Sequence, residues 1–211
     1  MDYLRDSIES ATYALSVLDE AVSYAYIRHV NFYSNSMGSR DFMAKDKLEQ
    51  AFYQTLVHFP PFLGDITQTS TNRLQVVVDK DNLNIPKYLE SQSGVHFSDI
   101  ESAGYHQDTW PRNLATAGKI PSPDPATGRI KLIDIHVMRL KENSGVIIST
   151  AFAHVITDGY GCFEFLNRWA DEARALISGE PAEQIAYCFD RAVVHRHLPE
   201  ENVPVKKEVS D

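Results

Sequence analysis

The sequence predicts an α/β fold in which a β-sheet is flanked by helices, and three kinds of pattern predict it. Two stretches, Val22 to Tyr33 and Ile130 to Leu140, show the alternation of side chains that is typical of strands. A third stretch, Gly145 to Ala153, is short, β-branched and apolar, which indicates a largely buried strand. Two further segments repeat apolar residues at the three- and four-residue spacing of helices that pack on a sheet.

The first part of the chain supplies a strand and then a helix. After the strand at Val22 to Tyr33, Asp41 precedes a helical pattern that Pro60 and Pro61 end, because proline cannot continue a helix. The stretch from Asp79 to Pro125 is rich in Asp, Asn, Ser, Gly and Pro, so we expect a long surface excursion with short elements. The apolar positions of the helix are Leu48, Ala51, Phe52 and Leu56.

The later part of the chain is expected to add a hairpin, a helix and a tail. A turn from Glu142 to Gly145 would join the two strands on either side of it. From His197 the composition turns to Pro, Glu and Lys, so residues 1–197 are expected to form one domain and residues 198–211 an exposed linker. The helical stripe between them, which we expect to be core, consists of Phe163, Leu166, Ala170, Ala173 and Ile177, widened by Phe165 and Trp169.

Composition argues against several classes of partner and location. The formal net charge of −9 argues against a nucleic-acid or anionic-membrane surface, since either would need clustered Lys and Arg. No stretch approaches the roughly 18 apolar residues of a membrane span, and the first residues lack the apolar core of a secretory signal. We therefore expect a cytoplasmic protein, in which Cys162 and Cys188 are free thiols.

The motif that begins at His154 is the most informative feature for function. It reads His-Val-Ile-Thr-Asp-Gly and follows the buried strand directly, at the end of the strand where open α/β sheets place their chemistry. A neutral imidazole with a pKa near 6.5 can accept a proton, so His154 is a candidate general base. A hydrogen-bonded structural histidine is the alternative. No metal site is expected, because no third ligand lies at suitable spacing.

The His154-x-x-x-Asp158-Gly159 motif resembles the signature of the BAHD acyltransferases, which move an acyl group from coenzyme A to an alcohol or amine. This family belongs to a wider chloramphenicol-acetyltransferase-like superfamily. The resemblance implies half of such a fold, with a mixed β-sheet flanked by helices, and a role in secondary metabolism. It extends from about Leu15 to Arg191 through elements in the family's order: Leu15-Ser16-Val17-Leu18-Asp19, the helix and turn from Lys47 to Gly64, Arg73 to Val78, and Phe189-Asp190-Arg191.

Two departures from the family limit this comparison. Asp65 stands where the family's turn usually carries Arg, so the role of that arginine is not transferred. The second family signature, Asp-Phe-Gly-Trp-Gly, is absent, so the chain looks like an N-terminal half that is inactive without a C-terminal half. Acyl-coenzyme A is the implied co-substrate, with no permanently bound cofactor. Since no Gly-rich phosphate loop occurs here, most phosphate contacts are expected from the missing half.

The resemblance also implies roles for individual residues. His154 would take the proton of a small hydroxyl or amine acceptor as it attacks the thioester. Asp158 would either form an ion pair that holds the loop, as in the family, or cap the following helix. Gly159 is expected to allow a backbone shape that a Cβ would forbid. His29 and Asn31 either line the acceptor pocket, as the family match implies, or belong to an ordinary solvent face.

Two functions other than that of a BAHD acyltransferase remain open from the sequence. A condensation-type domain would share the fold, but its motif carries two consecutive histidines, and Ala153 occupies the first place here. The second is a noncatalytic module that binds a small molecule or a protein, since one half of the enzyme lacks the side of the site that the other half would form.

Overall fold

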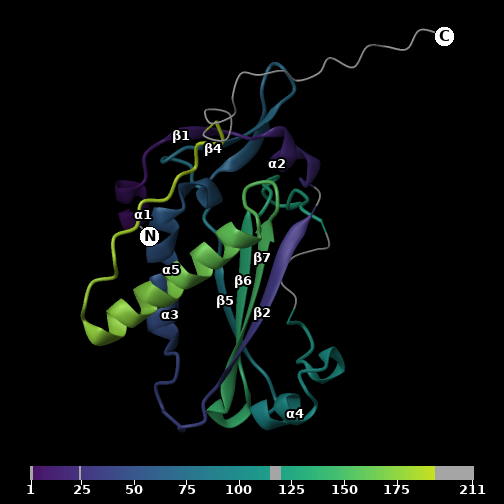
Figure 1. Cartoon of the computed structure of the whole chain (residues 1–211), viewed down its shortest axis with the longest axis vertical. Coiled ribbons are helices and arrows are strands. Elements are labelled where there is room, and N and C mark those ends of the chain that lie inside the picture. The colour runs from purple at the N-terminus through teal and green to yellow at the C-terminus, as the bar shows by residue number, and fades with distance from the viewer. Residues whose placement is uncertain (1, 24, 115–119, 193–211) are drawn as a thin grey trace, which may run out of the picture.

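The computed structural model describes residues 2–23, 25–114 and 120–192, and its centre is a four-stranded sheet (Figure 1). The strand order is β2-β7-β6-β5, formed by β2 (Tyr26–Ser34), β7 (Gly145–Ala153), β6 (Ile133–Arg139) and β5 (Tyr88–Gln92). β7 pairs antiparallel with both neighbours, whereas β5 pairs parallel with β6. The mixed sheet and the hairpin of β6 and β7 are therefore confirmed. The predicted strand from Val22 begins too early, because α2 (Val17–Ala21) ends there.

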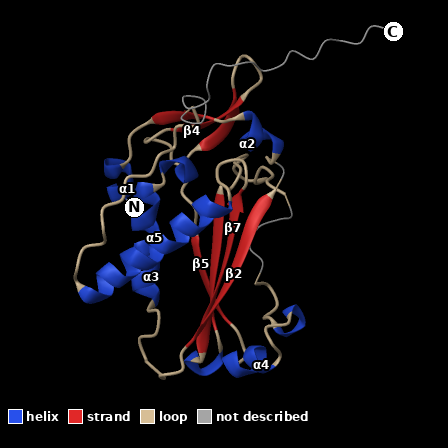
Figure 2. Cartoon of the chain, in the orientation of Figure 1, coloured by secondary structure: helices blue, strands red, loops and turns tan. Residues whose placement is uncertain are grey.

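A second, smaller sheet lies beyond the end of the large sheet at which β7 ends (Figure 2). It has the order β1-β4-β3 and is antiparallel throughout. Its strands are β1 (Ala11–Ala14), β4 (Leu74–Val78) and β3 (Asp65–Gln68). The short helix α1 (Asp2–Ser7) precedes this sheet in the chain. The small sheet thus borders the region into which the His154 motif emerges.

One face of the large sheet is covered by α3 (Lys45–His58) and α5 (Gly159–Ser178), which cross each other over the strands (Figure 1). Phe152 of β7 meets the Phe165 ring of α5 with 5.5 Å between ring centroids. The indole nitrogen of Trp169 donates to the Leu48 carbonyl at 2.9 Å, so this buried aromatic has its polar group satisfied. The core role predicted for Phe165 and Trp169 is confirmed.

The predicted apolar stripe of α5 is wrong at several positions. The buried residues are Cys162, Phe165, Arg168, Trp169 and Ala173, whereas Phe163 is 54% exposed and Ile177 is also exposed. The helix is rotated from the predicted orientation, because apolar residues at 162 and 163, and again at 165 and 166, permit two neighbouring stripes. Phe163 therefore lies at the border of the contact between helix and sheet, where it meets His29 of the edge strand β2.

Residues 95–114 pack on the opposite face of the large sheet, and they belong to the stretch from Asp79 to Pro125 that was predicted to be a surface excursion. The predicted short elements are present, but the prediction that the stretch stays outside the core is wrong. The stretch supplies the edge strand β5 and the helix α4 (Phe97–Ser102), which follows Ser93 and packs at the lower end of the sheet in Figure 1. A second core forms there from Phe97, Ile100, Leu114, Met138, Leu140 and Ile147.

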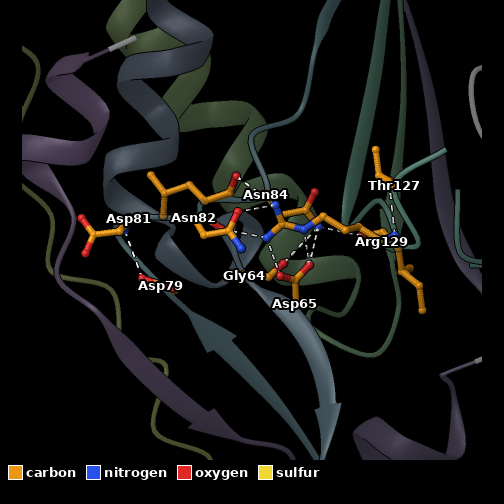
Figure 3. Close-up of polar contacts among 10 residues, drawn as sticks. Gly64, Asp65, Asp79, Asp81, Asn82, Asn84, Thr127 and Arg129 are labelled. Atoms are coloured by element: carbon orange, nitrogen blue, oxygen red, sulfur yellow. Dashed lines mark hydrogen bonds and ion pairs between the residues drawn. The ribbon is translucent and has the colours of Figure 1, made fainter.

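Asp65, the residue that departs from the family pattern, is paired with Arg129 (Figure 3). The Arg129 guanidinium donates from Nε to Asp65 Oδ1 at 2.8 Å and from Nη2 to Asp65 Oδ2, and it also donates to the Asn82 carbonyl at 2.8 Å. Asn84 bonds the Gly64 carbonyl at 3.2 Å and the Ile130 carbonyl at 2.9 Å. Together these contacts tie the turn before β3 to the segment that leads into β6.

Both cysteines are free thiols, as predicted, and burial raises the pKa of Cys162 to about 12, so that this thiol stays protonated.

Within residues 2–23, 25–114 and 120–192, none of the helices has the length and apolar character that crossing a membrane requires.

We expect the stability of the fold to fall as the pH drops below about 6.5, the ordinary pKa of histidine. Burial, and then the neighbouring Arg168 guanidinium, lower the pKa of His58, although Glu172 opposes this. Burial lowers the pKa of His29 in the same direction. The unfolded chain therefore binds more protons than the folded chain in the window below 6.5, and acidification favours unfolding.

Urea unfolding at about pH 7.5 and about pH 5.5 measures this effect. His58→Gln should lose less stability than the parent between the two values, since the amide oxygen still accepts from Arg168 Nη2, which lies 2.8 Å from His58 Nε2. Equal losses in the parent and the variant would show that His58 does not carry the dependence.

Candidate active site

His154 stands in a tight turn immediately after β7. Its backbone N–H donates to the Ala25 carbonyl at 2.9 Å, and the Ile156 N–H donates to the Ala153 carbonyl at 3.1 Å. Val155 and Ile156 are buried in the main core, whereas the His154 side chain is half-buried. The two apolar residues anchor the turn, and the imidazole is left at the surface of the sheet's end.

The two ring nitrogens of His154 differ in their surroundings. Nδ1 is enclosed and has no hydrogen-bond partner among the described residues, whereas Nε2 is not enclosed in this way. Within the described part of the chain, no group bonds Nδ1 and so holds the ring in one tautomer. Nε2 is therefore the more accessible of the two ring nitrogens.

His29 and Asn31 lie on the same face of the sheet as His154. In the pairing of β2 with β7, His29 is opposite Thr150 and Asn31 is opposite Ile148, and alternate residues of β7 lead from these to His154. His29 is packed against Phe163 at 5.0 Å between ring centroids, and burial lowers its pKa, which favours the neutral ring. Both residues are half-buried, which is not the pattern of an ordinary solvent face.

Asp158 caps α5. Its Oδ1 accepts a hydrogen bond from the Gly161 N–H at 2.8 Å, and its backbone is extended, as at other helix N-caps. Its carboxylate forms no ion pair within the described part of the chain. Of the two roles considered for Asp158, the structure therefore contains the helix cap.

The glycine that this loop requires is Gly161, and the prediction for Gly159 is wrong. Gly159 has no positive φ, and a Cβ built on it would meet no heavy atom within 4 Å. A Cβ on Gly161 would lie 2.3 Å from Thr157 Oγ1, because the first turn of α5 folds back over Thr157. Both glycines follow the motif's Asp, and only the packing distinguishes them.

Gly161→Ala is therefore expected to destabilise the chain by about 1 to 3 kcal/mol, the usual cost of adding a methyl group to a packed site. Gly159→Ala is the matched control. It places the same methyl group in open space two residues earlier and should leave stability unchanged or slightly raised. Chemical denaturation of both variants measures the difference, and equal stabilities would contradict the packing argument.

Neither of two large cavities near the motif is lined by His154. One of about 490 Å³ lies behind the loop, between Ile156 to Asp158 and the segment from Ile185 to Arg191. The other, of about 770 Å³, is on the opposite side of the large sheet and includes Arg28 and Trp110. His154 therefore lies outside both of these cavities.

Arg191, for which the sequence predicted no function, contacts the motif directly. Arg191 Nη2 donates to the Ile156 carbonyl at 2.7 Å, and Nε lies 3.3 Å from Asp19 Oδ2. The only indication in the sequence was that Arg191 and Asp19 belong to short elements that resemble those of the family.

Comparison with known proteins decides the family. A family model described as the transferase family matches residues 5–210. The chain belongs to the BAHD acyltransferases. Akuammiline synthase 1 of Alstonia scholaris is 28% identical over 167 residues, which cover 77% of this chain and 35% of that protein. Omega-hydroxypalmitate O-feruloyl transferase of Arabidopsis thaliana is 23% identical over 177 residues, which cover 78% of this chain and 34% of that protein.

The fold agrees with this family. TRI101 of F. sporotrichioides, solved with coenzyme A and T-2, superposes with a TM-score of 0.61 at 14% sequence identity. The match covers 78% of this BAHD chain and 39% of TRI101. The predicted chloramphenicol-acetyltransferase-like half, a mixed sheet flanked by helices, is therefore confirmed. The chain spans about a third of the length of the two BAHD relatives.

Proposed function

We propose that this chain is the N-terminal half of an enzyme that transfers an acyl group from acyl-coenzyme A to a hydroxyl or amine acceptor, with His154 as the general base. The observation that carries the proposal is the position of His154, at the end of β7 within the family's signature and with Nε2 not enclosed. The coenzyme A bound to TRI101 and the feruloyl transfer named for the Arabidopsis relative support this class of reaction.

The proposed reaction uses one proton carrier and no covalent enzyme intermediate. Nε2 of His154 takes the proton of the acceptor hydroxyl or amine while the acceptor oxygen or nitrogen bonds to the thioester carbonyl carbon. The tetrahedral intermediate then breaks its carbon–sulfur bond, and His154 returns the proton to the departing thiolate. The products are the acylated acceptor and free coenzyme A, and His154 is neutral again.

The described residues supply only part of such a site. The tetrahedral oxyanion needs hydrogen-bond donors, and Nδ1 of His154 needs a partner. We assign both to the C-terminal half, together with most of the coenzyme A contacts. His29 and Asn31 would line the acceptor side, since they share the face of the sheet that carries His154.

Three related predictions from the sequence belong to the same proposal. The boundary between a domain of residues 1–197 and a linker of residues 198–211 lies outside the described residues. The family's ion pair at Asp158 would need a cation outside them as well. A cytoplasmic location also stays a prediction, consistent with two free thiols.

The requirement for a second half can be tested by expressing the chain alone and together with a polypeptide that carries the Asp-Phe-Gly-Trp-Gly signature. We expect the chain alone to release no coenzyme A from acyl-coenzyme A thioesters in the presence of alcohols and amines, and the complex to release it. A 23.8 kDa monomer with full turnover would contradict the two-half requirement. A stable complex without turnover on a broad panel would favour a noncatalytic binding module.

A further inference from the structure

Arg191 links two parts of the chain that are far apart in the sequence, α2 and the His154 turn. Its Nε lies 3.3 Å from Oδ2 of Asp19, and its Nη2 donates to the Ile156 carbonyl at 2.7 Å. The Asp19 side chain is 18% exposed and the Arg191 side chain 34% exposed, so both are largely withdrawn from water. The guanidinium thus forms a bridge between a carboxylate and a backbone carbonyl.

The carboxylate end of this bridge is rigidly held. Oδ2 of Asp19 accepts hydrogen bonds from the Ser16 backbone N–H at 2.8 Å and from Ser16 Oγ at 2.7 Å. The Asp19 N–H donates in return to Ser16 Oγ at 3.2 Å, which completes a capping box at the start of α2. The position of the carboxylate is therefore fixed independently of Arg191.

The carbonyl end of the bridge lies within the turn that carries His154. Ile156 is two residues after His154, and its N–H closes the turn on the Ala153 carbonyl. The turn is held at its start by the bond from the His154 N–H to Ala25 and beyond its end by the Asp158 cap. Arg191 provides the restraint between these two points, on the side of the loop away from the imidazole.

Among the residues that the structure describes, no other basic side chain lines this place. The cavity of about 490 Å³ behind the loop is lined by three acids, Asp19, Asp158 and Glu164, and Arg191 is the single basic residue among its described lining residues. Removal of the guanidinium would leave the Ile156 carbonyl and the Asp19 carboxylate without their shared cation. The loop would then have fewer restraints.

We propose that Asp19 and Arg191 are positioning residues that hold the His154 turn in its reactive orientation. This inference rests on the proposed function of His154. It gives one shared role to two elements of the sequence, Leu15 to Asp19 and Phe189 to Arg191, that contain no reacting group. Neither residue touches the acceptor or the thioester, so both act through the backbone of the motif.

In the complex with a C-terminal half, Arg191→Ala should lower kcat by about 10- to 100-fold with little change in the KM for acyl-coenzyme A, because the base is misplaced while the donor site remains. Added guanidinium ion should restore part of the rate by entering the vacated space. Asp19→Asn should lower kcat as well, and the double variant should be no slower than Arg191→Ala, since one bridge is lost in each case. Arg174→Ala, an exposed arginine of α5, is the matched control.

A second measurement, on the 211-residue chain, tests the Arg191 bridge without relying on catalytic activity. Nitrogen-15 NMR of the histidine rings should show a changed His154 signal in Arg191→Ala, together with faster hydrogen exchange at Ile156 and Thr157. The ring signal of His58 should be unchanged. An unaltered His154 ring and unaltered exchange would overturn the bridge, whatever the activity. If Arg191→Ala does not fold, Asp19→Asn is measured in its place, and an unaltered His154 signal there has the same meaning.

The two proposals fail in different ways. Full activity of a His154→Ala complex would remove the general base but leave the NMR result on the loop intact. A normal NMR spectrum of Arg191→Ala, with a large loss of rate in His154→Ala, would remove the bridge alone. A fall in kcat without rescue by guanidinium and without a change at His154 would also count against the bridge.

Discussion

His154→Ala should lower the turnover of the reconstituted enzyme by about two to four orders of magnitude, the usual contribution of a positioned general base. The alanine cannot accept the acceptor's proton, so the attack must rely on water as the base. The KM for acyl-coenzyme A should change less than kcat, because the imidazole acts in the transition state rather than in donor binding. Steady-state release of free coenzyme A measures both constants.

The control for this experiment is a measurement of folding stability. His154 is half-buried and its side chain forms no hydrogen bond within the described part of the chain, so His154→Ala should change the melting temperature little. His106→Ala removes an exposed histidine far from the motif and should leave both rate and stability as they are. A His154→Ala complex that retains near-normal acyl transfer would remove His154 from the chemistry.

Arg168→Ala should destabilise the chain by about 3 to 5 kcal/mol, the usual result of removing one partner of a buried ion pair. The Arg168 side chain is only 2% exposed although it lies on α5 among apolar residues. It pairs with Glu172, contacts His58 Nε2 at 2.8 Å and donates to the Glu183 carbonyl. Alanine would leave the Glu172 carboxylate without its cation and the Glu183 carbonyl without its donor.

A matched control is available on the same helix. Arg174 also pairs with an acid, Asp171, but its side chain is 70% exposed, so Arg174→Ala should cost less than about 1 kcal/mol. A double variant, Arg168→Leu with Glu172→Leu, should recover part of the lost stability, because it removes both charges at once. Urea unfolding of the three variants tests this. Similar losses for Arg168→Ala and Arg174→Ala would contradict the importance of burial.

The sequence alone was sufficient for elements whose pattern is local. The run from Gly145 to Ala153 is apolar at nearly every position, and such a run of β-branched residues is stable only as a buried strand, whichever neighbours it pairs with. The turn before it and the two prolines after α3 are equally local signals. The position of His154 at a strand end follows from these elements, whereas the family was inferred from the resemblance of motifs between Leu15 and Arg191.

Local patterns could not determine which of two adjacent apolar stripes of α5 faces the sheet. Phe163 and Phe165 have similar affinity for a core, and the choice was made by Phe62 and Phe152, which approach the helix from other elements. The stretch from Asp79 to Pro125 was misjudged for a related reason. A polar composition indicates loops, but a five-residue edge strand needs only β6 beside it to form.

The sequence by itself determined the secondary structure around the motif, the family and the residue that is the candidate base. The tertiary structure decided which glycine of the loop is constrained, that Asp158 is a helix cap, that Asp65 pairs with Arg129, and that Arg191 reaches the Ile156 carbonyl. The physical reason is the range of the interactions. Hydrophobic periodicity and turn chemistry act over a few neighbouring residues, whereas a steric clash or an ion pair depends on which distant segments meet, and the chain order does not specify that.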